Sequence, residues 1–166
     1  MVAAALPAAA AVDPAAEALL QTWNAAKLGS CEEFLLSLDQ ETATAILGSC
    51  ADYLDILRSL SAPELFLLFA AMRVEAAPGE VANWDGRAVL ELMLTAPAHA
   101  YFLDNSNLQI DSLQEGESCC MVAFTIRDPS GRRTPLCLPV VLDDAGWRVS
   151  GLDTLMTTLI ENSFFY

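Results

Sequence analysis

The stretch that decides the fold runs from Glu117 to Gly151, ESCCMVAFTIRDPSGRRTPLCLPVVLDDAGWRVSG. Apolar side chains occupy every second position twice, from Cys120 to Ile126 and again from Leu136 to Leu142. This alternation is typical of β-strands that bury one face. Each run ends in a turn sequence, Asp-Pro-Ser-Gly at 128–131 and Asp-Asp-Ala-Gly at 143–146. The stretch therefore predicts three antiparallel strands, the last of them short and centred on Trp147.

The residue types in this meander also predict local detail. Proline and glycine at the second and fourth positions of 128–131 favour a type I turn with a left-handed exit. Pro135 and Pro139 lie four residues apart in one strand, so their missing N–H groups point to the same side. We expect that side to form a sheet edge, a bulge or a contact with a short neighbouring strand.

The composition limits the class of protein. A chain of 166 residues is long enough for one core, and we predict a single domain over residues 13–166. Apolar residues make up 54% of it, but the longest apolar run, Leu65 to Met72, is too short to span a bilayer. We therefore expect no stable membrane insertion, and expect the apolar surplus to be buried, to line a cavity or to form an interface.

The net charge of −14 indicates which partners are disfavoured. Lys27 is the only lysine in the chain. An acidic surface repels phosphate backbones, so nucleic acid is not an expected partner.

Residues 1–12 form an Ala-rich leader that precedes the predicted domain. Its apolar stretch, its proline and its small residues resemble the end of an export signal, although the positive n-region is missing. This reading predicts a periplasmic or secreted protein. The alternative is a disordered leader on a cytoplasmic one.

Helix signals dominate the part of the chain before the strands. Asp13-Pro14, Ser30, Asp39 and Ser61 each begin a helical pattern as a cap. The helix over Leu65 to Met72 is apolar on every side, which predicts a central position. Residues 76–83 are expected to form a loop.

The later elements are less clearly marked. Trp84 to Thr95 is predicted to be helical with Asp85 as a possible cap, and Pro97 is expected to stop that helix. Tyr101 to Leu103 and Asn107 to Leu113 are weaker strand candidates. A last short helix is expected from Asp153. Helices followed by strands without alternation favour an α+β fold, with N-terminal helices packed on a curved antiparallel sheet.

The closing Gly146-Trp147-Arg148-Val149 strand after Asp143-Asp144 resembles the nuclear transport factor 2-like superfamily. The resemblance covers residues 107–155 most clearly, and covers 13–60 only in outline. It implies a cone in which a curved sheet wraps around helices. About four or five helices precede the meander where the family usually has three, so the resemblance implies a helix-rich variant. Members include isomerase-like and cyclase-like enzymes as well as non-catalytic binding and accessory domains, and the fold does not choose among them.

An enzyme of this superfamily would place an aspartate as general base and a tyrosine as oxyanion donor inside the cone. The candidates here are Asp104 or Asp111 with Tyr53 or Tyr101. None of them matches a family motif residue by residue. Tyr53 also falls on the expected buried stripe of its helix, where a core role with its hydroxyl satisfied at the rim is the favoured explanation. A small isomerase-, dehydratase- or cyclase-like enzyme is therefore the alternative hypothesis.

The main hypothesis is a non-catalytic domain that binds a small apolar ligand or a protein partner. It rests on the apolar surplus without a constellation of catalytic groups. A ligand in the cone would contact Phe69, Tyr101, Phe124 and Trp147. A third hypothesis is a homodimer built sheet to sheet. The aromatic end, Phe164 to Tyr166, would dock on the domain itself or join such an interface.

The remaining reactive residues indicate no cofactor or metal. The five cysteines have no metal-ligand spacing. Cys31 and Cys50 could form a disulfide across neighbouring helices, although small buried apolar residues are the favoured interpretation. His99 is the only histidine, and the sequence shows no catalytic-triad residues at a diagnostic spacing from it.

Overall fold

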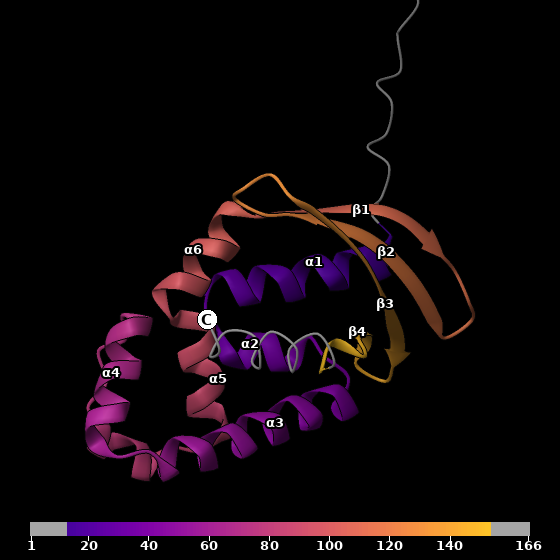
Figure 1. The fold of residues 1–166 in the computed structure, drawn as a ribbon. Helices are drawn as coiled ribbons and strands as arrows, with labels where there is room; N and C mark the ends of the chain where they lie inside the picture. Colours follow the sequence, from indigo (N-terminus) through magenta and orange to yellow (C-terminus); the bar gives the residue numbers. More distant parts are fainter. Residues whose placement is uncertain (1–12, 154–166) are drawn as a thin grey trace, which may run out of the picture.

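The computed structural model describes residues 13–153 and has an α+β fold, as predicted (Figure 1). The predicted leader, the predicted helix beyond Asp153 and Phe164 to Tyr166 lie outside the described residues. The elements in chain order are α1 (Pro14–Lys27), α2 (Cys31–Leu36), α3 (Gln40–Ser59), α4 (Ala62–Met72), the 3-10 helix η1 (Pro78–Asn83), α5 (Gly86–Thr95), α6 (Pro97–Asn105), β1 (Asn107–Gln114), β2 (Cys119–Arg127), β3 (Arg133–Asp143) and β4 (Gly146–Val149).

The four strands form one antiparallel sheet in the order β1-β2-β3-β4. Its buried face carries the alternating residues of the meander, with Val122 opposite Leu138 and Cys120 opposite Val140. A bulge at Asp111 interrupts the pairing of β1 with β2. The turn at 128–131 is as expected, because the Gly131 N–H donates to the Asp128 carbonyl oxygen at 2.9 Å and Gly131 has φ of +85°.

The two prolines of β3 face the side that carries the short strand β4. The Ser150 N–H donates to the Pro139 carbonyl oxygen at 2.9 Å, so the position of the missing Pro139 N–H also points to that side. Pairing with β4 covers only Val140 to Asp143. The expectation of a short neighbour is therefore confirmed.

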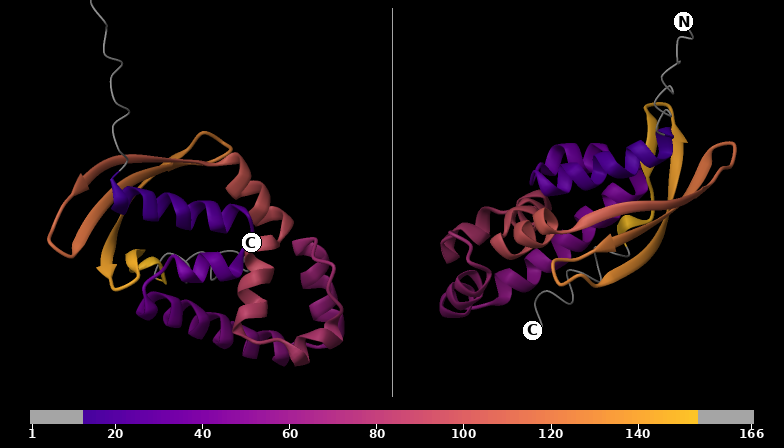
Figure 2. Two further views of the ribbon diagram at one scale, coloured as in Figure 1. Left: turned by 180° about the vertical axis from the view of Figure 1, so that it is seen from behind. Right: turned by 90° about the horizontal axis from the view of Figure 1, so that it is seen from above.

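Helix α1 fills the concave side of the sheet (Figures 1 and 2). It contacts all four strands, and its buried residues are mostly alanines around Leu19 and Thr22. Small side chains let the helix backbone approach the sheet closely, and Leu19 then occupies the space that remains. The space under the sheet is thus part of the core, which includes Val122, Phe124 and Val149.

The corner between α2 and α3 is fastened to the sheet through β4. Leu38 forms a parallel bridge with Val149, and the Asp39 N–H donates to the Val149 carbonyl oxygen at 3.0 Å. The Asp39 carboxylate caps α3 by accepting from the Thr42 N–H and hydroxyl, both at 2.9 Å. Burial opposes its ionised form, but these bonds and one from Ser150 outweigh burial and lower the pKa of Asp39.

Two predictions about the middle of the chain are wrong. The predicted strand at Tyr101 to Leu103 lies inside α6, because Pro97 begins a new helix instead of only ending the previous one. Ala96 serves as C-cap of α5 and N-cap of α6 at once. The expected loop at 76–83 contains η1, whose Val81 is buried.

The predicted central position of the helix at Leu65 to Met72 is also wrong. Helix α4 lies at the end of the helical layer furthest from the sheet (Figure 1 and the right view of Figure 2). Only Leu65 and Phe69 are fully buried in it, whereas Phe66 is 64% exposed and Leu67 is 67% exposed. No helix among residues 13–153 combines the length and apolarity needed to cross a membrane.

We expect Gly86→Ala to lower the free energy of unfolding by about 1–3 kcal/mol. Helices α3 and α5 approach closely at this glycine, where a Cβ atom would lie 2.8 Å from the Leu47 carbonyl oxygen, a backbone atom. The matched control is Gly48→Ala on α3, where a Cβ atom meets nothing within 4 Å. The control should gain about 0.5–1 kcal/mol from helix propensity. Urea unfolding measures both, and equal effects would contradict the close approach.

Candidate interaction surface

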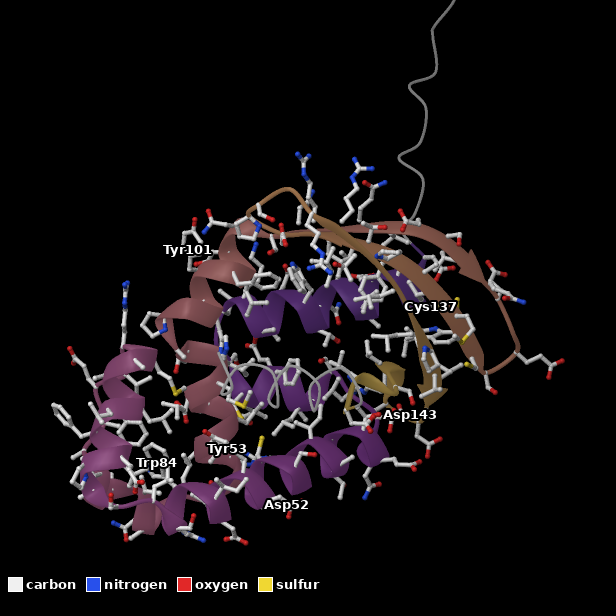
Figure 3. All side chains as sticks on the ribbon, viewed as in Figure 1. Asp52, Tyr53, Trp84, Tyr101, Cys137 and Asp143 are labelled. Atoms are coloured by element: carbon white, nitrogen blue, oxygen red, sulfur yellow. The ribbon has the colours of Figure 1, made fainter. Side chains whose placement is uncertain are left out.

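The structure does not bring the four enzyme candidates together. Tyr101 on α6 is 62% exposed, and Asp104 one turn later is exposed too. Asp111 lies on the outer face of the sheet, where its carboxylate accepts from the Thr125 hydroxyl at 2.6 Å. Tyr53 comes from α3, away from Tyr101 (Figure 3). Burial raises the pKa of Tyr53 well above its ordinary value, so its phenol stays protonated.

The four residues predicted to contact a ligand are likewise dispersed. Phe69 packs against Trp84 at the α4 end of the molecule, with ring centroids 5.7 Å apart. Phe124 is buried on the concave face of the sheet, and Trp147 is half-buried on β4. Tyr101 is exposed on α6. A shared site for these four side chains is therefore not present under the sheet.

One hollow with polar and apolar walls lies beside α4. It has a volume of about 600 Å³, is open to solvent, and runs between the end of α4, η1 and α5. Its walls include Arg73, Glu80, Trp84 and Glu91. Because it is open, it is a groove beside the helix and not an enclosed ligand cavity.

The clearest unusual surface is the outer face of α4, which consists of Pro63, Phe66, Leu67, Ala70 and Ala71. All five side chains are exposed. They lie together because the buried residues Leu65 and Phe69 occupy the opposite side of the helix. Clustered apolar side chains of this size on a protein surface are typical of interaction sites.

Helix α4 is held by a few well-defined contacts. Its first turn carries the predicted capping box, in which the Glu64 carboxylate accepts from the Ser61 N–H at 2.7 Å and the Ser61 hydroxyl at 2.6 Å. Phe69 anchors its middle against Trp84, and the Trp84 carbonyl oxygen accepts from the Arg58 guanidinium at 2.9 Å. Arg73 ends the helix in the left-handed region, with φ of 56°. The outer face thus belongs to a helix that is held at its first turn and at its middle.

The reactive side chains have structural surroundings. Within residues 13–153, no group of three or more His, Cys, Asp or Glu side chains could hold a metal ion. Cys31 and Cys50 are both free thiols, and burial raises the pKa of Cys50 to about 11. His99 Nδ1 lies 2.8 Å from the Met93 carbonyl oxygen, and a carbonyl only accepts, so this nitrogen donates.

The outer face of α4 was missed by sequence reasoning, although its signal was present. A helix that is apolar on all sides can lie at the centre of a domain. It can equally lie at the periphery, with its outer face covered by a partner. Only the position of α4 at the end of the helical layer separates the two.

No protein-family model, no curated protein and no solved structure matches this chain. The function must therefore be inferred from the chain's own residues.

Proposed function

We propose that this chain is a non-catalytic protein-interaction domain that binds its partner through the outer face of α4. The observation that carries this proposal is the exposure of Phe66 and Leu67 next to three small apolar residues on one helix. Burying exposed apolar area yields about 25 cal/mol per Å², and aromatic side chains are frequent anchors of protein interfaces.

A small apolar ligand under the sheet has less support than a protein partner. Helix α1 occupies that space, and the buried residues of α1 belong to the same core as Val122 and Phe124. The enzyme alternative has no specific support either, since its two aspartates are exposed on α6 and in β1, whereas Tyr53 lies on α3.

We also propose that the fold is a helix-rich variant of the nuclear transport factor 2-like cone. Support comes from the curved meander of β1 to β4, its closing Gly146-Trp147-Arg148-Val149 strand and the helix on its concave side. In this variant the interaction surface would lie on α4, outside the cone.

The proposed function predicts site-specific cross-linking from α4. A photo-cross-linking amino acid is placed at Leu67, and a control at Asp52, which is exposed on α3 (Figure 3). Irradiation of cells that naturally make the protein should give a protein adduct of defined mass from position 67 but none from position 52. The same partner should no longer co-purify with the Leu67→Glu variant, because a buried unpaired carboxylate is costly. No adduct from either position would contradict the proposal, as would equal adducts from both.

A further inference from the structure

We propose that the partner of α4 is a second copy of this chain, bound with the two α4 helices antiparallel about a twofold axis near Leu68. This inference rests on the proposed function and names its partner. It is carried by two features of α4, the order of its side chains by size and the scarcity of charged residues along it.

The sizes of the side chains on the outer face are self-complementary. Phe66 and Leu67 stand together near the middle of α4, and Ala70 and Ala71 follow one turn later. In an antiparallel pair, Leu67 lies level with Ala70 of the second copy, and Phe66 lies over the end of the face where the second copy presents only the small side chains Ala70 and Ala71. A twofold axis repeats each contact, so large side chains meet small ones throughout. A parallel pair would instead place large side chains against each other and leave the alanines facing alanines.

The low charge of the outer face of α4 also suits contact between two copies of a strongly acidic chain. A net charge of −14 opposes association of two copies through most of the surface. The segment Ala62–Met72 carries a single charged residue, Glu64. Association through α4 therefore avoids most of the like-charge repulsion.

The size of the contact sets the expected affinity. A helix of 11 residues is about 16 Å long, so a pair of such helices falls in the class of interfaces below about 1,200 Å² that is typical of transient complexes. We expect a dissociation constant in the micromolar range, on the order of 10 µM.

The test is sedimentation equilibrium of the full chain from about 1 to about 500 µM, with an exchange of side chains across the proposed contact. Leu67→Ala should weaken dimerisation about tenfold, the loss expected for truncating an interface anchor. Ala70→Leu should weaken it by crowding Leu67 of the second copy. The double variant Leu67→Ala/Ala70→Leu restores large against small, and it should return the dissociation constant to within about threefold of the original.

The exchange of side chains tests dimerisation separately from the stability of the folded monomer. Positions 67 and 70 are exposed, and leucine and alanine are both good helix formers, so the urea midpoint of unfolding of each variant should stay at that of the original protein. Met121→Glu is the control for a sheet-to-sheet dimer, because Met121 is 37% exposed on the outer face of β2. It should leave dimerisation unchanged.

Several outcomes would overturn the inference. They are a monomer at every concentration, a double variant no better than Leu67→Ala, or a dimer lost in Met121→Glu and kept in Leu67→Ala. A monomeric pure protein whose position 67 cross-links to a different protein in cells would overturn the second copy as partner. It would leave the proposed function standing, whereas absence of all adducts would remove both.

Discussion

Phe69→Ala is expected to lower the free energy of unfolding by about 3–5 kcal/mol, the usual cost of emptying a buried phenylalanine site. Phe69 is only 2% exposed, and its ring packs against Trp84. Its removal leaves α4 attached mainly through Leu65 and half-buried Leu68. Chemical denaturation followed by circular dichroism measures the loss.

The matched control is Phe66→Ala on the same helix. Phe66 is the same residue type three positions earlier, but its ring faces solvent. We expect a change within about 0.5 kcal/mol in the free energy of unfolding of the monomer, together with weaker association of the two copies. If Phe66→Ala destabilised the monomer as much as Phe69→Ala, the outer face of α4 would be covered within the chain and both proposals would fail.

Leu19→Ala is the second substitution with a large expected effect, a loss of about 2–5 kcal/mol. Leu19 is 3% exposed and is the largest buried side chain of α1. Its truncation should open an apolar cavity among the alanines of α1, and a dry cavity of this kind binds small apolar molecules such as benzene. Benzene should therefore raise the melting temperature of the variant, because it binds the folded state alone.

The original protein and Leu28→Ala serve as controls for this experiment. Leu28 directly follows α1 and is 77% exposed, so its truncation should change stability little. Benzene should stabilise neither protein. If it stabilised the original protein as strongly as Leu19→Ala, the space under the sheet would already hold a cavity, and the small-ligand hypothesis would gain over the protein-partner one.

The fold could be predicted from sequence where one physical rule acted alone. The alternation from Cys120 to Leu142 indicated a sheet with one buried face, since no helix buries every second residue. The caps at Asp13, Asp39 and Asp85 were equally readable, and each accepts a backbone N–H as expected. These signals are local, so they do not depend on what the rest of the chain does.

The prediction failed where two rules competed. Pro97 can end one helix or begin the next, and its own neighbourhood does not decide between them. The apolar residues of α4 indicate that the helix is covered on all sides. They do not indicate whether the cover is the chain's own core or a partner. The candidate site was missed for this reason, because the helix at Leu65 to Met72 was assigned to the centre of the chain's own core.

The open part of the β3 edge is a poor template for self-association through strands. Pro135 and Pro139 remove two of the donors that point away from β2, which leaves the Cys137 N–H alone between them. An incoming strand needs a run of consecutive donors and acceptors, so it finds no template there. This edge of the sheet is thereby guarded against growth into fibres.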